Sequence, residues 1–288
     1  MAKNRIQDNG GWFSRIGRWV VRAFLLTWSV CVLFPLIWVI YTSFKNNQEF
    51  YASVWALPKV WHFENYEYAW NVAKFSSYYL NSFFTVALTL VLTLIMTTTT
   101  AYAVAKFRYR WLKLFDKFYM VVMAIPGVLI LIPQYFMFLN WGWTDNLVTL
   151  SLLYAVGSVP FSVFMQMSFM RKVDNALLEA AEIDGASEFQ KFFQIVLPCV
   201  KPALFVTALM NIMGTWNEYV KALTFLSDES KYTVPIGLSQ LQNSSTYSVE
   251  YGGLFAGLVI AMIPILVIYG IFQKQLLNGV ASEGSVKG

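Results

Sequence analysis

Charged side chains are scarce in this sequence. Lys, Arg, Asp and Glu make up only 13% of its 288 residues, whereas 57% are hydrophobic and 18% are aromatic. A soluble domain carries charge on about a quarter of its residues, because its surface must face water. This chain has too little charge to cover such a surface. The composition therefore argues against an ordinary soluble domain and indicates a membrane protein.

Cysteine and histidine are nearly absent. The two cysteines, Cys31 and Cys199, belong to separate parts of the chain, and His62 is the only histidine. Neither a disulfide framework nor the paired spacing of a metal site can be built from these residues. We therefore predict no disulfide and no bound metal, and we interpret His62 as a structural residue.

The motifs of several enzyme classes are missing as well. The sequence Gly-x-x-x-x-Gly-Lys-Ser/Thr does not occur, so this chain cannot hold ATP phosphates in a P-loop. The patterns His-Glu-x-x-His and Gly-x-Ser-x-Gly are also absent, which argues against a metalloprotease or a hydrolase. Carboxylates within apolar stretches are too few for a proton relay. We predict no catalytic residue, no cofactor on this chain, and an energy source on another polypeptide.

Long apolar stretches are what the sequence has in abundance. Six of them can each cross about 30 Å of hydrocarbon as a helix, and the alternating pattern of barrel strands is absent. The sequence predicts an all-α membrane protein with six transmembrane helices and a core over residues 76–275. The spans are 23–44, 76–105, 118–139, 146–170, 202–226 and 251–273, with prolines that predict kinks at Pro126, Pro133 and Pro160.

The distribution of charge predicts the orientation. Sixteen of the 21 Lys and Arg residues, but only eight of the 16 acidic residues, flank the spans on one side. Positive residues accumulate on the cytosolic side of a membrane. We therefore expect a cytosolic segment 1–22, an external aromatic-rich loop 45–75 and a cytosolic tail 276–288. The net charge of +5 follows from this topology, and nothing in it requires a nucleic acid partner.

The segment between the fourth and fifth spans has a local pattern of its own. A helix here would expose the small side chains of Ala180 and Ala181. Gly185 can end that helix, because glycine adopts positive φ without steric cost. Ser187 can cap a second helix, which Pro198 then stops or kinks. The pattern predicts a helix–turn–helix on the inner membrane surface, and an amphipathic linker between two spans is its simplest explanation.

Glu-Ala-Ala at 179–181, Asp-Gly-Ala at 184–186 and Ile-x-Leu-Pro at 195–198 resemble the EAA loop of ABC-importer permeases. In that family the loop forms a coupling helix that docks on the ATP-hydrolysing subunit, and the fold is that of a type I importer permease. The resemblance identifies residues 171–202 as a docking loop, although the proline that usually precedes the loop is missing. It assigns docking or seating roles to Glu179, Ala180, Ala181, Asp184, Gly185, Ala186, Phe189, Phe192, Leu197 and Pro198.

Four further segments resemble the carbohydrate branch of the same family, and within it the second permease of maltose-type importers. They are Ala101-Tyr102-Ala103, Trp216-Asn217-Glu218-Tyr219, Thr233-Val234-Pro235-Ile236-Gly237-Leu238 and the tail at 278–288. The resemblance covers about residues 65–288. It implies that the tail contacts the ATPase through Gly284, Val286, Lys287 and Gly288.

The resemblance also implies a function and a set of partners. This chain would pair with a second permease, as a heterodimer, in the cytoplasmic (inner) membrane of a bacterium or an archaeon. Two copies of an ATPase subunit would bind ATP and Mg²⁺, and an external solute-binding protein would deliver a sugar or an oligosaccharide. Transport would follow alternating access, driven by rigid-body movement of the subunits.

Polar side chains within apolar spans are candidates for the wall of a passage. On this ground alone we select Asn81, Thr99, Gln134 and Asn217. Glu218 and Lys221 are three residues apart on one predicted helix face, so we expect them to satisfy each other as a local pair.

Other functions remain open at this stage. A charged solute such as glycerol phosphate or an oligouronate would need cationic groups in the passage, and Lys221 is the one candidate. A secondary-transporter subunit would need no ATPase and would work alone in a membrane. A membrane enzyme would need a cluster of catalytic groups, which the sequence lacks.

Overall fold

The computed structural model describes residues 12–107, 109–243 and 250–284, and the regular structure within these ranges is entirely helical. Four helices are long and apolar enough to cross a membrane. They are α1 (Trp12–Thr42), α4 (Phe75–Lys106), α7 (Leu147–Met170) and α14 (Tyr251–Gly284). Two sharply bent helix pairs bring the number of spans to six if each pair is one span. The predicted all-α membrane architecture is therefore confirmed.

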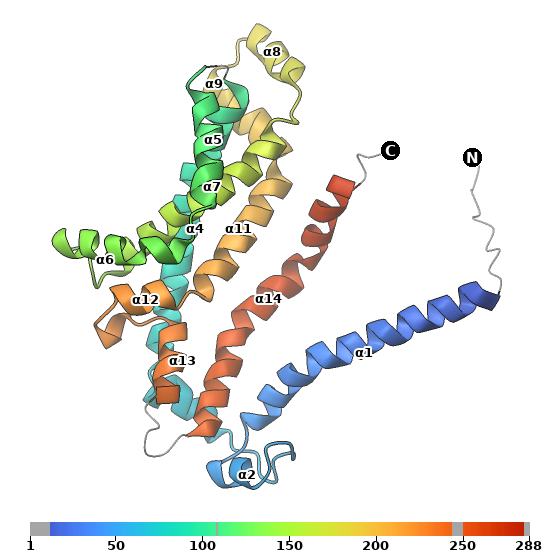
Figure 1. Cartoon of the computed structure of the whole chain (residues 1–288), viewed down its shortest axis with the longest axis vertical. Coiled ribbons are helices and arrows are strands. Elements are labelled where there is room, and N and C mark those ends of the chain that lie inside the picture. Colours follow the sequence, from blue (N-terminus) through green and yellow to red (C-terminus); the bar gives the residue numbers. More distant parts are fainter. Residues whose placement is uncertain (1–11, 108, 244–249, 285–288) are drawn as a thin grey trace.

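The third predicted span is not one helix. It consists of α5 (Leu112–Met123), followed by the 3₁₀ turn η2 (Gly127–Ile130) and α6 (Leu131–Asn140), and the two limbs meet at 87°. The break lies at Pro126, whose backbone is extended and which lacks the N–H that a continuing helix needs. The kink predicted at Pro126 is therefore confirmed, and it is sharp enough to end α5, so that α6 projects to the side of the bundle (Figure 1).

The fifth predicted span is also interrupted. Its helix α11 (Lys201–Trp216) follows α9 (Glu188–Gln190), the π-helical turn η3 (Lys191–Val196) and α10 (Leu197–Cys199), with a bend of 76° between the two parts. α11 ends at Trp216, and the chain resumes as the short helix α12 (Val220–Phe225). The helix predicted over 202–226 was therefore wrong at its C-terminal end, where residues 217–219 form a non-helical connection.

The core of the bundle is the packing of α4 against α7. α4 turns a stripe of threonines toward its neighbour, one every fourth residue, and each of them is buried: Thr85, Thr89, Thr93 and Thr97. The hydroxyls of Thr93 and Ser158 lie 3.0 Å apart, and Gln166 Nε2 donates to Thr97 Oγ1 at 2.9 Å. Small polar side chains let two helix backbones approach closely while satisfying each other in an apolar medium.

α1 diverges from the rest of the bundle (Figure 1). Its candidate span, Ile16–Thr42, has no buried residue in its most apolar window. The helix contacts the bundle near its C-terminal end, where the ring of Trp38 lies edge-on to Phe255 at 5.1 Å. The boundary predicted at residue 22 falls inside α1, so the end of the N-terminal segment and the first span form one continuous helix.

The predicted external loop and the predicted docking loop lie at opposite ends of the molecule (Figure 1), as the charge pattern requires. The external loop contains α2 (Asn47–Ala52), α3 (Glu64–Glu67) and the π-helical turn η1 (Tyr68–Val72). His62 contacts Glu64 and lies 3.2 Å from Asn46 Nδ2 through its other ring nitrogen. Both of these contacts lie within the external loop.

The same end carries a second external segment, with the 3₁₀ turn η4 (Glu229–Lys231) and α13 (Val234–Asn243). Asp145 joins it to the loop before α7. The Asp145 carboxylate accepts hydrogen bonds from the backbone N–H groups of Ser227 and Asp228 and lies 2.6 Å from Lys231 Nζ. Burial opposes ionisation of Asp145, but these three donors outweigh it and lower its pKa to about 2.

Candidate functional site

The docking loop starts with α8 (Asn175–Ile183). The side chain of Asp174 accepts a hydrogen bond from the backbone N–H of Ala176 at 3.0 Å, so it caps the first turn of α8. At the other end of α8, Gly185 has φ +81°. Gly185 N–H bonds to Glu182 O at 3.0 Å, and Ala186 N–H bonds to Ala181 O at 2.8 Å. These two bonds form a Schellman C-cap, so the predicted helix break at Gly185 is confirmed.

The second limb of the loop starts at Ser187, as predicted. Ser187 and Gln190 form a capping box, in which each side chain bonds to the backbone N–H of the other. The limb continues through α9, η3 and α10 to Val200, where the chain turns into α11. Pro198 lies in α10, two residues before that turn. The predicted helix–turn–helix is therefore present.

The predicted docking residues fall into exposed and inward-facing groups. Ala181, Ala186 and Leu197 are half-buried and Phe192 is buried, whereas the others are exposed: Glu179, Ala180, Asp184, Gly185, Phe189 and Pro198. Phe192 packs against Tyr102 of α4 with ring centroids 4.9 Å apart, in a cluster with Val163 and Met167 of α7. This packing seats the second limb against the transmembrane helices.

One exposed residue of the loop was missed by the sequence analysis. Ile183 is 87% exposed, and it stands between Glu182 and Asp184, immediately before the turn. Phe189 is 71% exposed and packs against Phe193, with tilted rings whose centroids lie 4.3 Å apart. We call Ile183, Phe189 and Phe193 the apolar tip. An isoleucine within an acidic run beside a turn was the signal that could have revealed it, because exposed apolar groups at a charged surface indicate a contact site.

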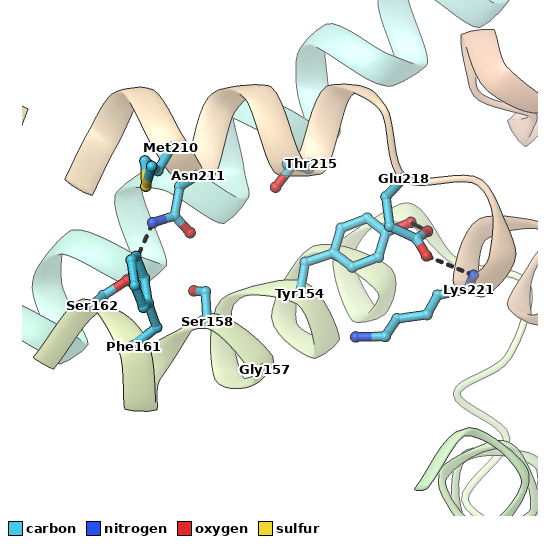
Figure 2. Close-up of a pocket in the computed structure, with 11 residues that line it drawn as sticks. Tyr154, Gly157, Ser158, Phe161, Ser162, Met210, Asn211, Thr215, Glu218 and Lys221 are labelled. Atoms are coloured by element: carbon cyan, nitrogen blue, oxygen red, sulfur yellow. Dashed lines mark hydrogen bonds between the residues drawn. The ribbon is translucent and has the colours of Figure 1, made fainter. Parts of the chain in front are cut away.

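A second candidate site is a hollow of about 360 Å³ between α7 and the end of α11, which we call the polar hollow (Figure 2). Its wall combines two aromatic rings with hydroxyl, amide and charged groups. The lining residues are Tyr154, Gly157, Ser158, Phe161, Ser162, Met210, Asn211, Gly214, Thr215, Glu218 and Lys221. A concave surface with aromatic faces and convergent polar groups is typical of a small-molecule site.

Glu218 is held rigidly at one end of the hollow. Tyr154 Oη donates to Glu218 Oε2 at 2.6 Å, and the backbone N–H groups of Lys221 and Ala222 donate to its two oxygens at 2.8 and 3.1 Å. The carboxylate thus caps α12. The predicted pairing of the Glu218 and Lys221 side chains was wrong, because α11 ends before Glu218 and the two residues do not share a helix turn. Among the described residues, no ion pair reaches Lys221 Nζ, which lies 6.0 Å from the ring centre of Tyr154.

The four predicted passage residues are not brought together. Asn81 donates to Ser230 O and Tyr232 O at 2.8 and 3.0 Å, so it fastens the external segment to α4. The hydroxyl of Thr99 bonds back to Ile95 O, and the amide of Asn217 bonds back to Met213 O. Gln134 lies on α6, with its Oε1 buried and unpaired within the described chain. None of the four lines the polar hollow.

The hollow had a sequence signal of its own. Ser158 and Ser162 are four residues apart in one span, and Asn211 and Thr215 are four apart in another. Residues at this spacing share a helix face, so two polar faces were present in the sequence. The sequence did not show that these two faces meet in the fold.

The predicted contacts between the tail and the ATPase remain predictions, because Gly284 ends α14 while Val286, Lys287 and Gly288 lie outside the described residues.

Comparison with known proteins decides the family. Residues 98–281 match the model of the family described as "binding-protein-dependent transport system inner membrane component". This chain belongs to that family. The matched range includes the docking loop and the polar hollow. This chain is therefore a permease subunit and a multi-pass membrane protein, as the resemblance of its docking loop predicted.

Relatives of similar length support the assignment. The chain is 33% identical over 268 residues to the diacetylchitobiose uptake system permease NgcG of Streptomyces coelicolor, covering 93% of this chain and 88% of that protein. It is 30% identical over 266 residues to the trehalose/maltose permease MalG of Thermococcus litoralis, with coverages of 90% and 93%. A solved bacterial ABC transporter that imports alginate has the same fold, with a TM-score of 0.81, 24% identity and coverages of 92% and 98%. The predicted importer-permease fold is thus confirmed.

Proposed function

We propose that this permease takes up a sugar or an oligosaccharide as part of an ATP-driven ABC importer. Relatives named as permeases for diacetylchitobiose, galactooligosaccharides and trehalose/maltose, at 30% to 33% identity over most of the chain, support a carbohydrate as the cargo. A second permease would complete the passage in the cytoplasmic membrane of a bacterium or an archaeon. Two ATPase subunits would bind ATP and Mg²⁺, and an external binding protein would deliver the sugar.

The exposed apolar tip of the docking loop is the observation that carries this proposal. Ile183 and Phe189 stand out from a turn whose backbone is fixed by the Gly185 C-cap and the Ser187 capping box. Apolar side chains of this exposure gain free energy when a groove covers them, at about 25 cal/mol per Å² buried. The rigid turn presents them in one geometry, so little conformational entropy is lost on docking. Closure of the ATPase pair would move this tip and, with it, the transmembrane helices.

We place the polar hollow on the wall of the passage. The rings of Tyr154 and Phe161 offer flat apolar faces, and the hydroxyls of Ser158 and Thr215 lie beside them (Figure 2). A sugar presents apolar C–H faces and a rim of hydroxyls, so such a wall can stack on one and hydrogen-bond the other. The polar hollow is open on one side, which leaves room for the second permease to form the opposite wall of the passage.

A second candidate cargo is a sugar that carries a carboxylate or a phosphate. The ammonium of Lys221 lines the hollow without an ion pair to any described residue, whereas the carboxylate of Glu218 is occupied by three donors. A free ammonium beside a ring can bind an anionic group of a solute. The alginate importer that shares the fold transports an acidic polysaccharide.

The proposal is tested by co-purification. The chain is extracted in detergent from cells that express it with its partner subunits, and the bound ATPase subunit and its Mg-ATP hydrolysis are measured. Ile183→Asp should remove the ATPase subunit, because a carboxylate would replace the apolar contact in the groove. Val60→Asp is the matched control, since it places the same charge on an exposed aliphatic side chain of the external loop. Wild type that purifies alone and still transports would overturn the importer function in favour of a secondary transporter.

A further inference from the structure

One buried cation lies inside the docking loop. Lys191 is the first residue of η3, and only 5% of its surface is exposed. Its Nζ lies 3.0 Å from Glu182 Oε2 and 2.5 Å from Glu188 Oε1. Glu182 belongs to α8 and Glu188 to α9, on opposite sides of the Gly185 turn. A single ammonium therefore ties the two limbs of the loop together.

The same cluster reaches the transmembrane helices. Tyr102, near the cytosolic end of α4, donates its hydroxyl to Glu188 Oε2 at 3.0 Å. One turn further, Lys106 Nζ donates to Val173 O at 2.6 Å and to Asn175 Oδ1 at 3.0 Å, at the entry of α8. The end of α4 thus holds the docking loop at both limbs, through Lys106 on the first and through the Lys191 cluster on the second.

α4 continues from these contacts with the docking loop to the external end of the molecule. It has 32 residues and contains neither proline nor glycine, so it is a continuous rod of about 48 Å. At its other end Lys74 forms an ion pair with Glu229 at 3.0 Å, and Tyr78 Oη donates to the same carboxylate at 3.0 Å. One helix therefore connects the docking loop with the external segment, and its threonine stripe locks it to α7 on the way.

We propose that Lys191 is a positioning residue that makes the docking loop move as one body with α4. This inference rests on the proposed function, because it concerns how ATPase movement enters the membrane. The Lys191 side chain is buried, whereas those of Glu182 and Glu188 are 72% and 55% exposed. Separation of the limbs would therefore leave a buried ammonium without one of its two carboxylate partners, and this cost resists the separation. Without the ammonium, Glu182 and Glu188 would repel each other across the turn. The docking loop could then move with the ATPase subunit without moving α4.

The test uses the complete complex in proteoliposomes. Mg-ATP hydrolysis and uptake of a labelled sugar are measured together, with the sugar chosen as the one that wild type accumulates from a panel of neutral and acidic oligosaccharides. Lys191→Met keeps the aliphatic length and removes the charge, and Lys191→Arg keeps the charge. Lys59→Met is the matched control, because Lys59 is an exposed lysine of the external loop and lies outside the docking loop.

We expect Lys191→Met to hydrolyse ATP within about twofold of wild type while the sugar taken up per ATP falls about tenfold or more, a change that corresponds to about 1.4 kcal/mol. Lys191→Arg should restore most of the uptake, and Lys59→Met should match wild type. Tyr102→Phe, which removes one hydroxyl from the cluster, should lower uptake per ATP in the same direction by a smaller factor.

Three outcomes would overturn the inference. The first is an unchanged uptake per ATP in Lys191→Met, whether or not the complex is less stable, because a merely structural lysine lowers both activities together. The second is a failure of Lys191→Arg to restore uptake. The third is wild type that binds no ATPase subunit, which removes the proposed function as well and is recognised before any variant is compared.

Discussion

Gly185 offers the sharpest test of how the docking loop works. It is the residue after the α8 cap, and its φ of +81° lies in the left-handed region that favours glycine. A Cβ built at this position meets no atom within 4 Å, so a substitution there is strained by its backbone and not by a clash. Gly185→Val, Gly185→Ala and Gly185→Asn therefore form a series that isolates backbone conformation.

The magnitude follows from the backbone alone. An L-residue in the left-handed region costs about 1–2 kcal/mol relative to glycine, and a β-branched side chain lies at or above the upper end of that range. If this cost falls entirely on the docked form of the turn, the population of that form drops about 5–30-fold. Asparagine adopts the left-handed region more readily than other residues, so Gly185→Asn should stay close to wild type, with Gly185→Ala between the two.

The assay is the amount of ATPase subunit retained per permease, together with uptake in cells that contain equal amounts of the permease in their membranes. We expect both quantities to fall in the order glycine, asparagine, alanine, valine while membrane insertion stays normal. Normal uptake in Gly185→Val would refute the docking role of the turn. Equal losses of ATPase binding and uptake in the asparagine and valine variants would refute the backbone argument. They would show that any side chain at position 185 blocks docking, whatever its backbone preference.

Two further predictions concern the external end and the polar hollow. Asp145 has a pKa of about 2 in the folded chain against an ordinary value of 3.8, so its donors stabilise the external segment by at most about 2.5 kcal/mol above pH 4. This contribution should be lost between about pH 4 and pH 2, and Asp145→Asn should flatten that part of the pH profile of thermal unfolding; an unchanged profile would contradict the assignment. Lys221→Met should raise the KM for an acidic oligosaccharide about tenfold and leave a neutral one nearly unaffected if the solute is anionic. Equal effects on both solutes would exclude charge recognition by Lys221.

The local features of the docking loop were predictable because they depend on neighbours in the chain. A glycine after a helical run permits the left-handed C-cap, and Ser187 with Gln190 forms a capping box within four residues. Ile183 was overlooked, although its apolar side chain within an acidic run was visible in the sequence. Phe192 was grouped with the docking residues by motif, and its packing on Tyr102 came only from the fold.

The residues selected for the passage were not brought together, for a physical reason. A polar residue in an apolar span can bond to its own helix, fasten a loop or face a passage, and the sequence does not distinguish these uses. Asn81, Thr99 and Asn217 bond to backbone carbonyls, whereas Ser158, Ser162, Asn211 and Thr215 meet across two helices. The pairing of Glu218 with Lys221 failed because α11 ends at Trp216, before either residue of the pair.

The sequence by itself determined the class of the molecule. Apolar stretches of span length, the bias of positive charge and the docking-loop motif all follow from residue type and spacing, because the cost of burying charge or backbone in lipid depends on composition. The tertiary structure decided the 87° break at Pro126, the polar hollow and the Lys191 cluster. These features depend on which distant segments meet, as when Glu182, Lys191 and Tyr102 converge from three helical elements, and such contacts are fixed only when the helices pack.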